Sequence, residues 1–150
     1  MVLTWLRAFN ARRKIGIYCS DVSGAFDRVD GVRLLTKLKA MGLPAQIMNL
    51  VKKWLRERKA RVIVGGASSG ECTLRDMVYQ GTVLGPILWD LFFADARIPI
   101  RDAKFEEIIY ADDLNAMREY SASVAGDTIL RDCKRCQKNL HQWGEANRVS

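Results

Sequence analysis

Apolar residues recur along the chain with two periods, and these periods predict an alternation of strands and helices. The run from Ile15 to Val22 is apolar and partly β-branched, which predicts a buried strand that ends at Asp21. The segment from Glu106 to Met117 predicts two strands joined by a tight turn. Glycines and serines predict a further hairpin, with strands over 61–64 and 73–76.

Helical spacing of apolar residues predicts four helices after the first strand. They run from about 31 to 41, from about 45 to 58, from 86 to a stop at Ile98-Pro99, and from a cap within 121–125 to about 146. The residues predicted to face inward are Val32, Leu35, Leu38, Met41, Ile47, Leu50, Val51, Trp54, Leu55, Ile87, Leu88, Leu91, Phe92, Ile129, Cys133, Cys136, Leu140 and Trp143. This order of elements is typical of an α+β fold, an antiparallel sheet with helices packed on one face.

The first 14 residues carry basic side chains and no acidic one, around a loose apolar stripe of Leu3, Leu6 and Phe9. Such a start is typical either of a targeting segment or of a helix that belongs to the domain. We favour the domain helix, because Ile15 continues directly into the first strand without a cleavage-like spacer.

The composition is that of a single globular domain of 150 residues, 49% hydrophobic and 27% charged. No run approaches the roughly 18 apolar residues that a membrane span needs, so we expect no membrane partner. The net charge of +7 favours a polyanionic partner, although basic surfaces are also found simply solvated.

Four cysteines are too few and too irregularly spaced for a disulfide framework, which favours an intracellular, reducing compartment, without distinguishing nucleus from cytoplasm. Cys133 and Cys136 have the spacing of a metal or redox pair. Both also lie on the apolar stripe of the last predicted helix, so we interpret them as small core residues.

The chemistry of the chain is concentrated at Asp112 and Asp113, in the predicted turn. Two adjacent carboxylates repel each other unless a cation neutralises them, and hard oxygen ligands suit Mg²⁺ or Mn²⁺. Asp21 ends the first strand and would join them if the two elements are neighbours in the sheet. The alternatives are that Asp21 is a turn residue and that the other two form a solvated hairpin tip.

Three stretches, in this order, resemble motifs A, B and C of reverse transcriptases: 21–29, 80–89 and 110–113. Their Ser-Gly-Ala-Phe-Asp and Gln-Gly-x-x-Leu-Gly-Pro elements are most similar to the non-LTR (LINE-type) retrotransposon branch. Group II intron maturases share Tyr-Ala-Asp-Asp and are less close in the first two motifs. The resemblance covers residues 15 to 149.

The resemblance implies a polymerase palm that carries out RNA-directed DNA synthesis, with two Mg²⁺ or Mn²⁺ ions. Its partners would be a dNTP and an RNA or DNA template with a primer, whose 3′-hydroxyl receives the nucleotide. The implied metal ligands are Asp21, Asp112, Asp113 and the backbone carbonyl of Val22.

The resemblance also implies substrate contacts outside the carboxylates. Phe26 matches the bulky gate that excludes a 2′-hydroxyl, with an ordinary core phenylalanine as the alternative. Gln80 and Gly81 match the loop beside the incoming nucleotide, and their alternative is a simple strand-to-helix turn. Tyr110 would pack behind the carboxylates or near the primer end.

The helix predicted from about 45 to 58 is basic on its other face and at its exit, and these residues either contact template or primer phosphates or form a solvated face. The basic residues are Lys52, Lys53, Arg56, Arg58, Lys59 and Arg61.

The extent of the resemblance predicts that residues 1–150 are a partial reverse transcriptase domain, with motifs A to C but without fingers and thumb, from a longer polyprotein. We therefore expect the isolated chain to bind divalent metal weakly and not to polymerise. The alternatives are a non-catalytic nucleic-acid-binding or scaffold remnant of a decayed element, and a maturase-like reverse transcriptase.

Overall fold

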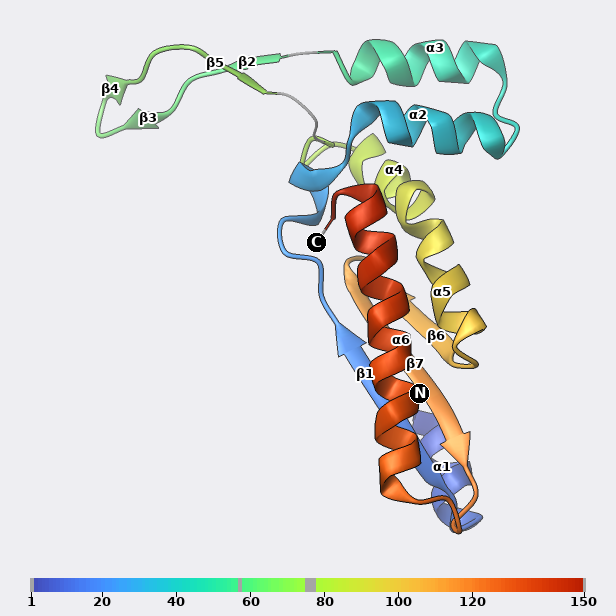
Figure 1. Cartoon of the computed structure of the whole chain (residues 1–150). Helices are drawn as coiled ribbons and strands as arrows, with labels where there is room; N and C mark the ends of the chain where they lie inside the picture. The colour runs from blue at the N-terminus through green and yellow to red at the C-terminus, as the bar shows by residue number, and fades with distance from the viewer. Residues whose placement is uncertain (1, 57, 75–77, 150) are drawn as a thin grey trace. The chain divides into compact units, whose positions relative to one another are not determined.

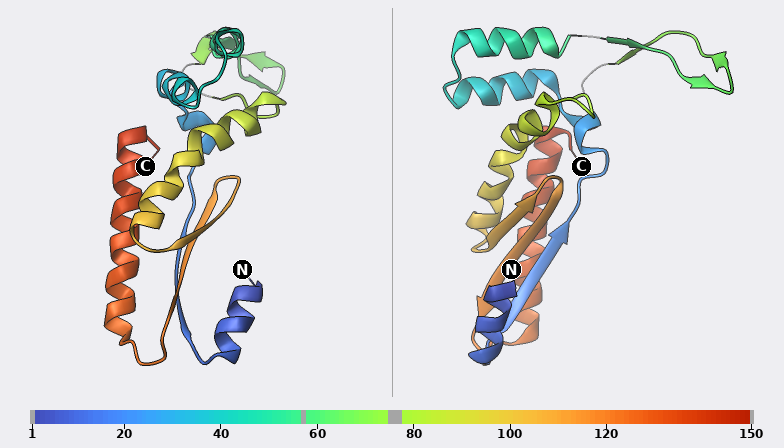
Figure 2. Two further views of the ribbon diagram at one scale, coloured as in Figure 1. Left: turned by 90° about the vertical axis from the view of Figure 1, so that its right-hand side faces the viewer. Right: turned by 180° about the vertical axis from the view of Figure 1, so that it is seen from behind.

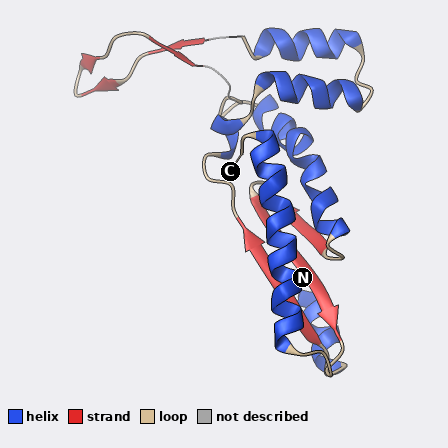
Figure 3. Cartoon of the chain, viewed as in Figure 1, coloured by secondary structure: helices blue, strands red, loops and turns tan. Residues whose placement is uncertain are grey.

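The computed structural model describes residues 2–56, 58–74 and 78–149. The chain divides into two compact units, a first one made of residues 1–23 and 93–150 and a second one made of residues 24–92. Both units combine helices with antiparallel strand pairs, which confirms the predicted α+β class (Figure 3).

The first unit is built on a three-stranded antiparallel sheet in the order β1-β7-β6 (Figure 1). The strands are β1 (Lys14–Ser20), β6 (Glu106–Tyr110) and β7 (Asp113–Tyr120), as the apolar runs predicted. The prediction of a buried first strand was wrong, because only Gly16 of β1 is buried. β1 is the edge strand of the described sheet, so one side of it has no neighbouring strand.

Helices cover the sheet of the first unit. The long helix α6 (Gly126–Asn147) packs along β1 and β7, while α1 (Val2–Asn10) lies on the other side of the strands (Figure 2). Gly16 allows the close approach of α6, since a β-carbon there would lie 2.8 Å from Cγ2 of Ile129. The predicted stripe of α6 is confirmed by the burial of Cys136 and Leu140.

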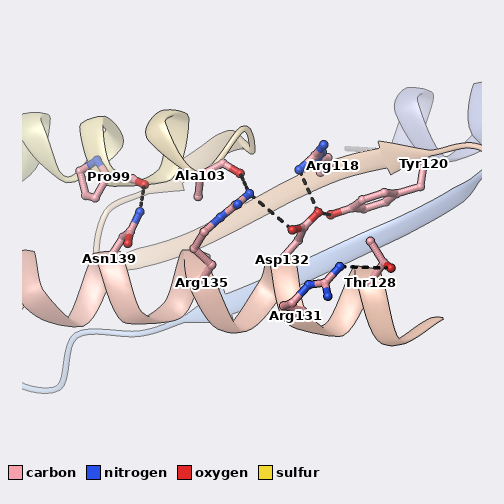
Figure 4. Close-up of polar contacts among 9 residues, drawn as sticks. All are labelled: Pro99, Ala103, Arg118, Tyr120, Thr128, Arg131, Asp132, Arg135 and Asn139. Atoms are coloured by element: carbon pink, nitrogen blue, oxygen red, sulfur yellow. Dashed lines mark hydrogen bonds and ion pairs between the residues drawn. The ribbon is translucent and has the colours of Figure 1, made fainter. Parts of the chain in front are cut away.

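A polar cluster fastens α6 to the strand beneath it (Figure 4). The Asp132 carboxylate accepts from the Arg118 guanidinium at 3.0 Å and from the Tyr120 hydroxyl at 3.3 Å, both on β7. Arg135 lies 3.4 Å from the same carboxylate and donates to the Ala103 carbonyl at 3.2 Å. One acidic residue of the helix thus holds three side chains.

Burial raises the pKa of the Cys136 thiol to about 11 and also raises the pKa of Cys133. Both thiols are therefore neutral near pH 7, whereas nucleophiles and metal ligands are thiolates. This agrees with their interpretation as core residues.

The helix predicted to stop at Ile98-Pro99 is longer and broken. α4 (Leu84–Phe93) is followed by the 3₁₀ turn η2 (Ala94–Ala96) and by α5 (Arg97–Asp102). Pro99 is the third residue of α5, where the amide that proline lacks would have no partner within the helix. The proline therefore did not end the helical segment.

The second unit contains η1 (Ala25–Arg28) and the packed helices α2 (Gly31–Ala40) and α3 (Ala45–Trp54). The Asp30 side chain caps α2 by accepting from the Arg33 amide at 2.9 Å. α3 ends four residues before the predicted Arg58. Buried residues of the unit include Val29, Leu34, Leu38, Val51, Val78, Leu88, Trp89 and Phe92.

Five residues predicted to face inward are exposed instead, namely Val32, Met41, Ile47, Leu50 and Ile87. On α2 the buried face runs through Leu34 and Leu38, one turn apart. A short helix with apolar residues on more than one side does not show from its sequence which side will be covered.

The predicted second hairpin is confirmed, with different strand ends. β2 (Arg58–Ala60) pairs with β5 (Cys72–Leu74), and β3 (Ile63–Val64) pairs with β4 (Ala67–Ser68). Residues 75 and 76 of the predicted second strand lie outside the described residues.

The first residues form a helix, as expected for a domain element, and Ala8 of α1 is buried. Its apolar stripe is not covered, since Leu3, Leu6 and Phe9 are 71%, 53% and 82% exposed. Among the helices of the described residues, none has the length and hydropathy to cross a bilayer.

Candidate functional site

The two adjacent carboxylates lie at the tip of the β6–β7 hairpin. Tyr110 pairs with Asp113, so Ala111 and Asp112 form a two-residue loop. Ala111 has a φ of 54°, while Asp112 is not among the described residues with positive φ. That sign pattern is typical of a type II′ turn, which matches the twist of the flanking strands.

The pairing of β1 with β7 brings the third carboxylate, that of Asp21, to the end of the sheet where the hairpin tip lies. Its last pair joins Ser20 to Leu114, so Asp21 and Asp113 are the next residues outward on two neighbouring strands. Asp112 belongs to the loop beside them. Residues about 90 positions apart in sequence are therefore neighbours along the backbone of one sheet edge.

The side chains of the three aspartates do not converge on one point in this structure. Within the described residues, no group of three or more His, Cys, Asp and Glu side chains is close enough to hold a metal ion, and this includes the three aspartates. Asp21 and Asp113 are exposed and Asp112 is half-buried. Like charges repel, so three carboxylates have no reason to converge without a cation between them.

The donor set nevertheless suits a hard divalent cation. In the described part of the chain, no ion pair or side-chain hydrogen bond engages these three carboxylates, whereas Glu119 and Asp132 of the same unit pair with arginines. Carboxylate oxygens that are exposed and uncommitted are ligands that Mg²⁺ and Mn²⁺ accept. The Val22 carbonyl follows Asp21 directly and belongs to the same edge.

A cavity of about 230 Å³ opens beside Asp21 in the first unit. Its lining is mainly apolar and comes from the end of β1, from β7 and from the last turns of α6. The lining residues are Ser20, Asp21, Val22, Ser23, Phe93, Leu114, Leu140, His141, Trp143, Gly144 and Val149. His141, the sole histidine of the sequence, lines the same cavity as Asp21. This could not be predicted, because no local pattern connects positions 120 residues apart.

Phe26 belongs to the second unit, in η1, and is half-buried. Its ring centroid lies 6.2 Å from that of Trp89, and its backbone carbonyl accepts from the Val78 amide at 2.8 Å. A β-carbon on Gly85 would lie 3.3 Å from the Phe26 ring, so this glycine makes room for it. These contacts fix the ring, and the gate role stays a prediction.

Gln80 and Gly81 form an exposed turn that leads into α4. Gly81 has a φ of 73°, which favours glycine. The Thr82 hydroxyl closes the turn by donating to the Tyr79 carbonyl at 2.6 Å. The turn interpretation thus accounts for Gly81, while Gln80 is exposed and its substrate contact stays a prediction.

Tyr110 is 81% exposed, so it does not pack behind the carboxylates in this structure. A position near the primer end stays a prediction for this residue.

The six basic residues fall into two groups. Arg58 stacks on Tyr79 and Lys59 pairs with Glu71 at 3.2 Å. For the remaining four, no ion pair or side-chain hydrogen bond occurs within the described residues. These four residues, Lys52, Lys53, Arg56 and Arg61, are exposed.

An antiparallel sheet that carries acidic residues at a hairpin tip and helices on its face has the architecture of a polymerase palm. The family model described as reverse transcriptase (RNA-dependent DNA polymerase) matches residues 5–149. The chain therefore belongs to the reverse transcriptase family.

Curated relatives agree with this assignment. The chain is 32% identical over 130 residues to the RNA-directed DNA polymerase from mobile element jockey of Drosophila melanogaster, a match that covers 83% of the chain and 14% of that protein. It is 35% identical over 94 residues to the probable RNA-directed DNA polymerase from transposon BS of the same species, covering 63% and 10%. The predicted non-LTR branch is confirmed, and the chain spans a small part of its relatives' length.

A more distant relative is the retrovirus-related Pol polyprotein from type-1 retrotransposable element R2 of Popillia japonica. The identity is 22% over 114 residues, which cover 69% of the chain and 19% of that polyprotein.

Proposed function

We propose that residues 1–150 are the motif A to C part of a palm that performs RNA-directed DNA synthesis within a longer polyprotein. Asp21, Asp112, Asp113 and the Val22 carbonyl would hold two Mg²⁺ or Mn²⁺ ions. The observation that carries the proposal is the strand register, in which Asp21 and Asp113 follow the last β1–β7 pair. When bound, such ions supply Lewis acidity for nucleotidyl transfer from a dNTP to a primer 3′-hydroxyl.

The aspartates have two tasks in this proposal. They neutralise the cations, and their attachment to paired strands fixes where those cations lie. Because the carboxylates lie at a sheet edge and are not engaged by other described residues, a substrate phosphate can approach the same point. Asp113 begins β7 and Asp21 directly follows β1, and rigid strands hold such ligands more accurately than loops do.

Nucleotide selection is assigned to the second unit. Phe26 packs against the face of α4 that carries Gly85 and Trp89, so its ring has little freedom to make room for a 2′-hydroxyl. The Gln80 amide would hydrogen-bond the incoming nucleotide or the template, and Gly81 would let the backbone come close. Lys52, Lys53, Arg56 and Arg61 would contact template or primer phosphates.

One observation favours a second candidate, a non-catalytic nucleic-acid-binding remnant. The three aspartates do not form a ligand group among the described residues. In that case the fold and the net charge of +7 would serve binding alone. The four free thiols are consistent with either function in a reducing, intracellular compartment.

Thermal unfolding with MnCl₂ or MgCl₂ separates the two candidates. Cation binding to the folded state alone raises the midpoint, by about 2–4 °C for each kcal/mol of linkage. We expect a rise for the wild-type chain and for Asp102→Asn, an exposed acid of α5, and no rise for Asp21→Asn or Asp112→Asn. Equal rises in all four proteins would contradict the assigned ligands.

Primer extension on an RNA template tests the activity itself. We expect none from the isolated chain and metal-dependent extension from a longer chain that includes the flanking sequence of the parent protein. Extension by the 150-residue chain that Asp112→Ala abolishes would overturn the first expectation. A longer chain whose extension survives Asp112→Ala would overturn the proposed mechanism.

A further inference from the structure

The segment 58–74 of the second unit forms one continuous two-stranded ribbon, which we call the arm. β3 and β4 continue the ladder of β2 and β5, because Val62 and Ser69 are joined by backbone and side-chain hydrogen bonds of 2.9 and 3.0 Å. Between the two ladders, Arg61 alone stands opposite two residues. This is a β-bulge, which strengthens the twist of a ribbon.

The tip of the arm is apolar and uncovered. Val62, Ile63 and Val64 are 60%, 72% and 72% exposed, and every residue from 61 to 73 is exposed. Gly65 and Gly66, both with positive φ, close the tip in the manner of a type I′ turn. A two-stranded ribbon with both faces in water is marginally stable alone, so three adjacent β-branched apolar residues there indicate a binding surface.

The base of the arm is fixed to the turn that precedes α4. The Arg58 guanidinium lies 4.1 Å from the Tyr79 ring centroid and 5.6 Å from that of Trp54. The Tyr79 hydroxyl donates to the Arg56 carbonyl at 3.0 Å. Because Tyr79 immediately precedes Gln80, the arm and the proposed nucleotide-binding turn have a common anchor.

The charge around the arm is positive. Within 58–74 three cations face one acid, and that acid, Glu71, is paired with Lys59. Lys52 and Lys53 at the end of α3 and Arg56 just after it add three further exposed cations, against one acid, Glu57, in the same stretch of sequence. A second copy of the chain would bring like charges together, whereas a polyanion would complement them.

We propose that the arm is a wedge for base-paired nucleic acid that contains an RNA strand. The cations contact phosphates, and Val62, Ile63 and Val64 enter the wide, shallow minor groove, where apolar side chains can open a base step. The choice of an RNA-containing duplex rests on the proposed function, while the apolar tip and its basic surroundings are observations of the second unit.

The test measures binding of the 150-residue chain to a 16-base-pair RNA–DNA hybrid in EDTA, by fluorescence anisotropy at several salt concentrations. A 2-aminopurine in the hybrid reports unstacking. Combined replacement Val62→Ser, Ile63→Ser and Val64→Ser should weaken binding by about tenfold and abolish the 2-aminopurine signal, with an unchanged salt slope. Combined replacement Lys52→Gln, Lys53→Gln and Arg61→Gln should lower the salt slope by about three.

The matched control replaces three exposed apolar residues outside the arm, Leu3→Ser, Leu6→Ser and Phe9→Ser on α1. This control should bind and unstack the hybrid as the wild type does. The proposal is overturned if the tip variant retains full affinity and signal, or if the α1 control loses as much as the tip variant. It is also overturned if light scattering shows that the tip residues hold two copies of the chain together instead.

This experiment is independent of the metal site because EDTA is present throughout. If Mn²⁺ does not stabilise the wild-type chain, the proposed metal site is wrong and the proposal for the arm is unaffected. Suppose that a longer chain shows metal-dependent extension and that its tip variant binds the hybrid normally. The proposal for the arm is then wrong, and the proposed function is unaffected.

Discussion

At the scale of single residues, Ala111 is in a conformation that its side chain disfavours. Its φ of 54° lies in the left-handed region, where a β-carbon approaches the following carbonyl and costs about 1–2 kcal/mol. The first position of a type II′ turn is normally glycine. The turn that carries Asp112 therefore keeps a strained alanine in place of a relaxed glycine, as is common at functional sites.

Replacement Ala111→Gly should stabilise the chain. Relief of the left-handed strain outweighs the entropy that glycine adds to the unfolded state, which leaves a net gain of about 0.5–1 kcal/mol. Urea unfolding measures it. Ala122→Gly, at an exposed turn residue without positive φ, is the control and should destabilise slightly. A lower midpoint for Ala111→Gly than for the wild type would show that the turn is not strained.

The sequence predicted the residues of the site better than their arrangement. Asp112 and Asp113 could be placed in a hairpin turn because the signal is local, an apolar run on each side of them. That Asp21 lies on the strand next to Asp113 depends on the register of β1 against β7, which the sequence did not show. The grouping of the three aspartates was predicted in advance only by the resemblance to reverse transcriptases. The cavity beside Asp21 was not predictable, because it depends on how α6 packs.

At the scale of elements, α6 is held on the sheet by a partly buried cluster around Asp132. Desolvation by burial raises the pKa of Tyr120 to about 12, although the nearby Arg118 acts in the opposite direction. The neutral phenol is thus favoured in the folded chain, where it donates to Asp132. Ionisation of this tyrosine would place two negative oxygens against each other beneath the helix.

The stability contributed by Tyr120 should depend on pH in the alkaline range. Its folded pKa lies above the unfolded value of 10, so the contribution is complete below about pH 10 and is lost as the pH rises toward 12. The difference in unfolding free energy between the wild type and Tyr120→Phe should therefore shrink from pH 9 to pH 11.5. Tyr18→Phe on the edge strand β1 is the control. A difference that does not change with pH would contradict the assignment.

Helix and strand types were predictable because they follow from periodicity, whereas boundaries and buried faces were not. α3 ends early at Trp54, where the chain leaves the helix for the arm, and Pro99 lies inside α5 because a first turn tolerates it. Val32 of α2 and Met41 at its C-cap are exposed since the neighbouring elements cover the Leu34 side. Such choices depend on contacts between elements that are distant in sequence.

At the scale of the whole molecule, the residues proposed to bind metal and those proposed to contact nucleotide or nucleic acid lie in different units. The proposed metal ligands Asp21, Asp112 and Asp113 all belong to the first unit. The proposed gate Phe26, the Gln80 turn and the arm all belong to the second. The first unit is assembled from both ends of the chain, and the second is the continuous segment between them. An experiment can therefore ask whether a ligand that binds one unit also affects the other unit.

Hydrogen exchange should therefore respond to Mn²⁺ in the first unit alone. A cation between the carboxylates joins the ends of β1 and β7 and suppresses their local opening, so peptides covering 14–23 and 106–120 should exchange more slowly. Peptides of the arm should be unaffected by Mn²⁺ and should be protected by the RNA–DNA hybrid in EDTA. Asp113→Asn should remove the Mn²⁺ effect and keep the effect of the hybrid. If Mn²⁺ protects the arm as strongly as the strand ends, the metal does not act through the aspartates of the first unit.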